Sequence, residues 1–215
     1  MLLRTIETDI DRYLKSKSHE ILFVWGPRRS GKTTLIDKLV KELGVTKYNF
    51  DLVSDREKFA PRREVLERIV KDNKVVLIDE VQNYPEATVM LKLLHDEFKT
   101  KVIATGSSEL RQKSSKEFDT MAGRFNEIYC LPLSVSEIVN NGKLLTKDLQ
   151  IFGAYPEVYI KDDLSENDRI DILQHMLDAY VLKDVIDIYD LKNTKLAKDI
   201  LTKIALQLGS EVSIR

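Results

Sequence analysis

The chain has 215 residues, a formal net charge of −1 and 43% hydrophobic residues, enough for one large domain or a domain with a smaller appendage. Its balanced charge argues against overall nucleic-acid binding, and a single cysteine, Cys130, excludes an intrachain disulfide. The apolar runs are too short to span a bilayer and the first residues lack the apolar core of a signal peptide, so we expect a soluble cytoplasmic protein with no membrane partner.

Helices and strands are expected to alternate along the first part of the chain. Apolar residues at helical spacing predict a helix over residues 2–16, and the apolar run ILFVW predicts a buried strand over residues 21–25. The pattern continues as helix 33–43, strand 47–53, helix 61–71, strand 74–78, helix 85–98, strand 101–104 and strand 125–131. Such alternation predicts a parallel sheet covered on both faces.

From about residue 134 the pattern becomes helical only. Helices are expected over residues 134–140, 144–152, 168–189 and 194–208. The turn signal Asn141-Gly142 marks a boundary between the two patterns. We therefore predict a core of residues 1–140 and a helical segment of residues 141–208.

A glycine-containing loop follows the first predicted strand and precedes a helix. It fits the pattern G-x-x-x-x-G-K-[ST], whose backbone N–H groups cradle phosphate. The expected nucleotide-binding residues are Gly26, Pro27, Arg28, Arg29, Ser30, Gly31, Lys32, Thr33 and Thr34. In this pattern Lys32 reaches the β- and γ-phosphates and the Thr33 hydroxyl binds Mg²⁺. Arg28 and Arg29 are either solvated loop charges or contacts to phosphate, a neighbouring subunit or a partner.

Two acids follow the third predicted strand, in the sequence VVLIDE. Burial of that strand places Asp79 and Glu80 at its carboxyl end, beside the phosphate loop. We expect Asp79 to hold Mg²⁺ and Glu80 to orient and polarise the attacking water. A surface turn with two solvated acids is the plainer interpretation of such a pair on its own.

Two later residues have open interpretations. Ser107 either hydrogen-bonds near the γ-phosphate or caps a helix together with Ser108 and Glu109. Arg124, just before the fifth strand, either neutralises charge at a neighbouring subunit's nucleotide or forms an intrachain salt bridge.

The chain resembles the AAA+ superfamily of P-loop ATPases, and within it a prokaryotic, archaeal-type group of predicted ATPases with a C-terminal domain of unknown function. The matching stretches are WGPRRSGKTTL, VVLIDEVQNYPE, KVIATGSSE, MAGRFNEIYCLPLSVSEI, FGAYPEV and YVLKDVIDIYDLKN. This P-loop NTPase fold implies a five-stranded parallel sheet in the order 5-1-4-3-2, with a small helical domain after it.

The resemblance also implies roles for individual residues. Lys32 and Thr33 match the Walker A lysine and hydroxyl, and Asp79 and Glu80 match the Walker B pair. Ser107 falls at the sensor-1 position and Arg124 where relatives place an arginine finger. Relatives continue into a winged-helix module, so residues 209–215 are expected to begin such a module, through which DNA binding is possible.

The leading hypothesis is a Mg²⁺-dependent ATPase whose catalytic residues are Lys32, Glu80, Ser107 and Arg124, with ATP as the nucleotide. Such an enzyme is expected to drive a conformational or assembly switch, as a homo-oligomer or with an unknown protein partner. A nucleotide-dependent scaffold with negligible hydrolysis is the alternative. A third interpretation, a nucleic-acid-binding helix over residues 56–74, is disfavoured because acids interleave with its basic residues.

Overall fold

The structure is a computed structural model that describes residues 2–107, 120–142, 147–161, 163–178 and 194–207. By its contacts the chain forms two compact units, residues 1–162 and residues 163–215. The first unit contains the sheet and also helices as far as residue 159, whereas the sequence pattern predicts that a separate helical segment begins at residue 141. The stretch YVLKDVIDIYDLKN, the end of the helix predicted over 168–189 and residues 209–215 lie outside the described residues.

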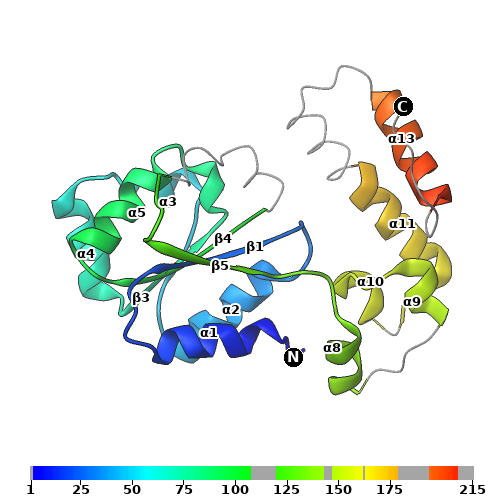
Figure 1. The fold of residues 1–215 in the computed structure, drawn as a ribbon, viewed down its shortest axis with the longest axis horizontal. Helices are drawn as coiled ribbons and strands as arrows, with labels where there is room; N and C mark the ends of the chain where they lie inside the picture. The colour runs from blue at the N-terminus through cyan, green and yellow to red at the C-terminus, as the bar shows by residue number, and fades with distance from the viewer. Residues whose placement is uncertain (1, 108–119, 143–146, 162, 179–193, 208–215) are drawn as a thin grey trace. The chain divides into compact units, whose positions relative to one another are not determined.

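A five-stranded parallel sheet forms the centre of the first unit (Figure 1). Its strands are β1 (Ile21–Gly26), β2 (Lys47–Asn49), β3 (Val75–Asp79), β4 (Lys101–Ser107) and β5 (Phe125–Tyr129). Their order is β2-β3-β4-β1-β5, which is the predicted order read from the opposite edge. The prediction of a P-loop NTPase sheet is therefore confirmed.

Two layers of helices cover the sheet (Figure 1). Helices α1 (Ile6–Lys15) and α2 (Lys32–Leu43) pack on one face, and α4 (Arg63–Asp72) and α5 (Ala87–Asp96) pack on the other. Successive side chains of a strand point to opposite faces. In β1, Leu22 and Val24 accordingly join the cluster under α1 and α2, whereas Phe23 and Trp25 join the cluster under α4 and α5.

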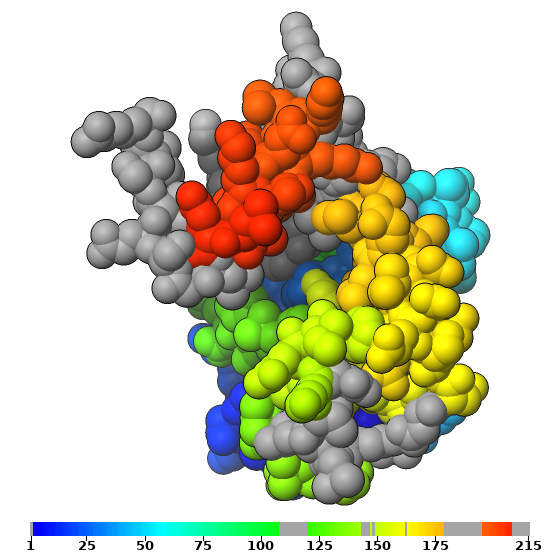
Figure 2. Space-filling model, turned by 90° about the vertical axis from the view of Figure 1, so that its right-hand side faces the viewer, coloured from blue at the N-terminus to red at the C-terminus, as the bar shows by residue number. Residues whose placement is uncertain are grey.

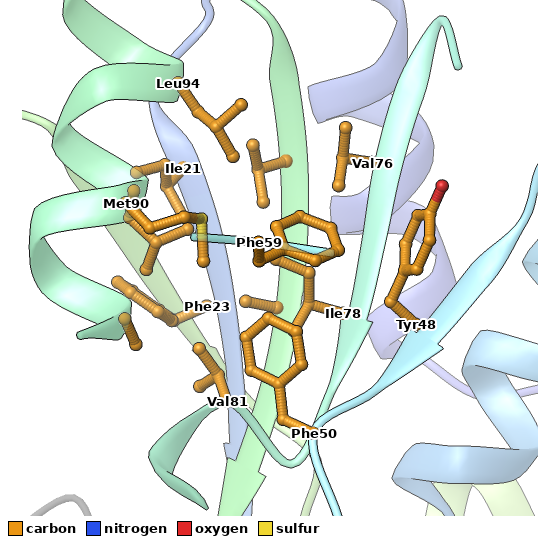
Figure 3. Close-up of a cluster of buried hydrophobic side chains, with 14 of the residues drawn as sticks. Ile21, Phe23, Tyr48, Phe50, Phe59, Val76, Ile78, Val81, Met90 and Leu94 are labelled. Atoms are coloured by element: carbon orange, nitrogen blue, oxygen red, sulfur yellow. The ribbon is translucent and has the colours of Figure 1, made fainter. Parts of the chain in front are cut away.

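The larger of the two clusters is built around aromatic side chains (Figure 3). Phe50 and Phe59 meet edge to face with 5.2 Å between ring centroids, and Tyr48 meets Phe59 in the same way at 4.7 Å. All three rings are buried beside Ile78 of β3. This packing fixes the strand that precedes the acidic pair.

The second strand is shorter than predicted. We expected strand character over residues 47–53, but β2 ends at Asn49 and a short helix, α3 (Val53–Glu57), follows. The backbone N–H of Asn49 donates to Asp55, and its side-chain oxygen accepts from the Asp51 N–H. These local bonds compete with strand pairing and turn the chain, while Phe50 remains buried in the core.

Three short helices complete the first unit, namely α8 (Val135–Asn140), α9 (Lys147–Phe152) and α10 (Pro156–Tyr159). Ser134 begins α8 with a capping box, in which its hydroxyl accepts from the Glu137 N–H and Glu137 accepts from the Ser134 N–H. The four-residue α10 was not predicted.

In the second unit the described residues form α11 (Glu166–Met176) and α13 (Thr194–Leu206). Helix α13 is drawn in orange and red in Figure 2. Among the described residues of the chain, no helix combines the length and apolar character needed to cross a membrane.

Candidate functional site

The carboxyl ends of three neighbouring strands, β1, β3 and β4, lie together at one end of the sheet. In the strand pairing, Gly26 of β1 lies opposite Ser107 of β4, and Ile78 of β3 lies opposite Ala104. Asp79 is the last residue of β3 and the phosphate loop leaves the end of β1. Parallel pairing therefore brings the loop, the acidic pair and Ser107 to the same edge, as the sequence predicted.

The loop from Gly26 to Gly31 depends on unusual backbone positions. Arg29 and Gly31 have φ angles of 62° and 101°, in the left-handed region. A Cβ atom on Gly26 would lie 2.1 Å from the backbone oxygen of Cys130, which follows the neighbouring strand β5. The loop therefore needs a glycine at its first position, where it passes against another backbone.

Lys32 begins α2 and turns its amine into this loop. The side chain is almost fully buried, and Nζ lies 2.8 Å from the Gly26 oxygen and 2.9 Å from the Pro27 oxygen. Thr33 and Thr34, in the first turn of α2, are exposed. A buried ammonium beside the N-terminus of a helix is suited to an anion.

Asp79 is buried and oriented by a side chain that sequence reasoning missed. The Thr105 hydroxyl, on β4, donates a hydrogen bond to Oδ1 of Asp79. Thr105 is itself fully buried. A carboxylate held in this way has a fixed direction, as a metal ligand requires.

Glu80 lies in the left-handed region with a φ of 56°, immediately after β3. Burial raises the pKa of this carboxyl above its ordinary value, while a hydrogen bond from Gln82 and the charge of Lys32 partly offset the rise. A carboxylate with a raised pKa is a better proton acceptor than a solvated one. The backbone conformation is costly for a non-glycine residue, and such strain is often found at functional sites.

Two buried hydroxyls at this edge have no hydrogen-bond partner among the described residues. They are Oγ of Ser30, in the loop, and Oγ of Ser107, at the end of β4. Buried hydroxyls usually have a partner, so two orphans beside a buried lysine fit a site for phosphate oxygens. The alternative in which Ser107 caps a helix involves residues 108 and 109, which lie outside the described residues.

Both arginines of the loop are partly buried. Arg29 forms an ion pair with Glu157 of α10, and both side chains are about one third exposed. This contact joins the phosphate loop to the stretch FGAYPEV, 128 residues later in the chain. Arg28 is half-buried.

Arg124 lies at the amino ends of the strands, whereas the phosphate loop lies at their carboxyl ends. Its backbone oxygen accepts from the N–H of Ile21, the first residue of β1, so five strand residues, or about 17 Å, separate it from Gly26. Its guanidinium pairs with Asp96 at 2.9 Å and 3.1 Å. Within one chain Arg124 therefore forms the intrachain salt bridge and is not brought to the same chain's loop.

Comparison with known proteins identifies the protein family of this chain. A family model described as an AAA domain matches residues 18–139. The chain belongs to this AAA domain family. The region matched contains all five strands, the phosphate loop and the acidic pair, in agreement with the AAA+ type of P-loop ATPase that the motifs indicated.

Two relatives come from the archaeon Methanocaldococcus jannaschii. Uncharacterized protein MJ1544 is 25% identical over 236 residues, which cover 99% of this chain and 52% of the relative. Uncharacterized protein MJ1637 is 23% identical over 178 residues, covering 77% of this chain and 36% of the relative. The chain thus spans about half, or less, of the length of these relatives.

Among solved structures, the chain is similar in fold to Hsp104 in the S. cerevisiae Hsp104:casein complex. The TM-score is 0.50 at 16% sequence identity, and the match covers 85% of this chain and 39% of that chain. This similarity is evidence for the fold alone.

Proposed function

We propose that this AAA domain binds ATP with Mg²⁺ and hydrolyses it at the edge formed by β1, β3 and β4. The observation that carries the proposal is the position of Glu80, with its raised pKa, next to the buried Asp79 and on the same edge as Lys32. A loop that only held nucleotide would not need an ionisable group in this position.

The proposed binding residues come from the sequence motif and lie at the same end of the sheet. The loop from Gly26 to Thr34 surrounds the phosphates with backbone N–H groups, and Lys32 supplies positive charge from within it. The hydroxyls of Ser30 and Ser107 donate to phosphate oxygens. Thr33 and Asp79 would hold Mg²⁺, which when bound would neutralise charge on the phosphates.

Glu80 orients a water molecule and accepts a proton from it as the water oxygen attacks the γ-phosphorus. The bond between the γ-phosphorus and its bridging oxygen breaks, and ADP and phosphate leave. Thr105 keeps Asp79 in place during this step through its hydrogen bond. Arg124 would act on the nucleotide of a second copy, since it lies far from its own loop.

The experiment that tests the proposal is phosphate release from ATP with Mg²⁺ over a range of protein concentrations. Lys32→Ala should abolish both binding and release and so controls for contaminating activity. Glu80→Gln should keep ATP binding while turnover falls about a hundredfold or more. Unchanged turnover in Glu80→Gln would contradict the role of Glu80.

A nucleotide-dependent scaffold with negligible hydrolysis is the second candidate. The salt bridge between Arg124 and Asp96 favours it, because the guanidinium is then paired within its own chain and would have to leave Asp96 before it could act on a second copy's nucleotide. If ATP binds but no phosphate is released at any protein concentration, the scaffold is the better description.

A further inference from the structure

Arg4, just before α1, reaches the phosphate loop from outside. Its NH1 group donates to the backbone oxygen of Ser30 at 2.9 Å, and its NH2 group donates to the oxygen of Leu131 at 2.6 Å. Its Nε donates to Oε1 of Glu137 at 3.0 Å. The Arg4 side chain is only 10% exposed; its bonds to Ser30 and Glu137 are partly buried, whereas the bond to Leu131 lies at the surface.

Glu137, on α8, is the anion that makes this position possible. Its side chain is 8% exposed, and besides Arg4 it accepts from the backbone N–H groups of Thr5 and Ser134 at 2.7 Å and 2.9 Å. Burial by itself would raise the pKa of Glu137, but the hydrogen bonds from Ser134, Thr5 and Arg4 outweigh it and hold the pKa below its ordinary value. Glu137 is therefore ionised at neutral pH and pairs with a full charge.

The bond to Ser30 helps to fix how one peptide of the loop is turned, together with a weaker bond of 3.5 Å from the Cys130 thiol to the same oxygen. In a planar trans peptide the C=O of Ser30 and the N–H of Gly31 point in opposite directions. By holding the Ser30 oxygen, Arg4 directs the Gly31 N–H to the side away from itself. A Cβ on Gly31 would lie 3.1 Å from the Arg4 NH1 atom, so the guanidinium also contacts this residue closely.

Two side chains, one on α8 and one just after it, form hydrogen bonds with the backbone on either side of Arg4. The side chain of Asn141, which follows α8, accepts from the Leu3 N–H at 2.8 Å and donates to the Leu3 oxygen at 2.9 Å. Thr5 is held by Glu137. Residues 3–5, the phosphate loop and α8 thus share one connected network of hydrogen bonds.

Stability alone does not explain this arrangement. A buried ion pair often contributes less than a well-packed apolar pair, because two charges must be desolvated. A guanidinium, however, presents five donors in a rigid plane and can satisfy three acceptors in different directions, which an ammonium on a flexible stem does poorly. The geometry suits a residue that orients other groups.

We propose that Arg4 is a positioning residue for the phosphate loop, and that Glu137 sets the position of Arg4, so that α8 and the loop change conformation together. The proposal rests on the proposed function insofar as the loop binds nucleotide. Loss of Arg4 lets the peptide between Ser30 and Gly31 rotate, which removes one preformed donor and weakens phosphate binding. Displacement of α8 by a partner or by motion of the chain has the same consequence.

The test uses Arg4→Lys and Arg4→Gln, with Glu137→Gln as a third variant in case the second does not fold. Matched controls are Arg12→Lys and Arg12→Gln, since Arg12 lies on α1 and its ion pair with Asp9 is exposed. Without nucleotide, we expect amide hydrogen exchange over residues 28–31 to speed up in the Arg4 variants and to stay unchanged in the Arg12 variants.

The second measurement is ATP affinity, monitored by the fluorescence of Trp25, the chain's single tryptophan, which directly precedes Gly26. Affinity should fall about tenfold in the Arg4 variants and stay at the parent's value in the controls. Folded Arg4 variants with parental exchange over residues 28–31 and parental affinity would overturn the proposal. Faster exchange spread evenly along the chain, with parental affinity, would also overturn it.

A failure of the proposed ATPase function gives a different result from a failure of the Arg4 proposal. If the parent chain binds no ATP, the nucleotide assignment falls. The exchange measurement in the absence of nucleotide still decides whether Arg4 positions the loop.

Discussion

The side-chain amide of Gln82 donates a hydrogen bond to the carboxylate of Glu80, with 2.5 Å between Nε2 and Oε2. The other end of the same amide, Oε1, is buried and has no partner among the described residues. It lies 2.6 Å from the point where a Cβ on Gly106 would stand. Gln82, two residues after Glu80 in the chain, therefore fixes the Glu80 carboxylate relative to β4.

Removing this amide should shift the pH dependence of turnover. Burial raises the pKa of Glu80 and the bond from Gln82 lowers it, so Gln82→Ala should raise the pKa further. Turnover needs the ionised carboxylate and is lost as the pH falls through this pKa. The acid limb of the turnover profile should therefore move to higher pH. Asn83→Ala, which removes a neighbouring amide bonded to Asp51, is the control; an unshifted limb in Gln82→Ala would argue against this link.

The Thr105 hydroxyl should matter for metal affinity. It orients Asp79, and loss of a group that orients a metal ligand typically weakens metal binding about tenfold or more. We expect Thr105→Val to raise the Mg²⁺ concentration for half-maximal phosphate release by about tenfold, whereas Thr105→Ser keeps the hydroxyl and stays near the parent. If the two variants need the same Mg²⁺ concentration, Thr105 does not act on the metal site.

The first glycine of the loop should be far less replaceable than a glycine in a turn. A Cβ on Gly26 would overlap the Cys130 backbone oxygen, so Gly26→Ala should lower the free energy of unfolding by about 3 kcal/mol. At Gly44, the C-cap of α2, nothing lies within 4 Å and only the φ of 64° opposes a side chain, so Gly44→Ala should cost about 1 kcal/mol. Denaturant unfolding of both variants measures the difference, and equal costs would show that the close approach at Gly26 is readily relieved.

A role of Arg124 at a second copy's nucleotide can be distinguished from its role in the salt bridge by comparing variants of Arg124 and Asp96. An exposed pair of this kind contributes little to stability, so both Arg124→Ala and Asp96→Ala should unfold nearly as the parent does. If Arg124 serves a second copy's nucleotide, only Arg124→Ala should lose the rise in specific ATPase activity with protein concentration. Equal activity in both variants at every concentration would leave the salt bridge as the residue's role.

Local sequence patterns were enough to predict the strands, the loop and the helix around the candidate site. A continuous apolar run, a glycine loop and a helix pattern each extend over a few neighbouring residues, and the run VVLIDE places two acids directly after a buried strand. The family pattern then implied the strand order. The same local reasoning overextended β2, because the bonds among Asn49, Asp51 and Asp55 that end it depend on side-chain conformations that a hydrophobic pattern does not contain.

The sequence alone therefore predicts the order of the elements, the sheet and the residues expected to face a nucleotide in such a sheet. The tertiary structure shows which distant side chains orient these residues. Thr105 meets Asp79 because β4 pairs with β3 in one particular register, and Arg4 meets Ser30 because α1 packs beside α2. Arg29 and Glu157 are 128 residues apart. Such contacts depend on how distant segments pack, and a single sequence has no periodic signal for that.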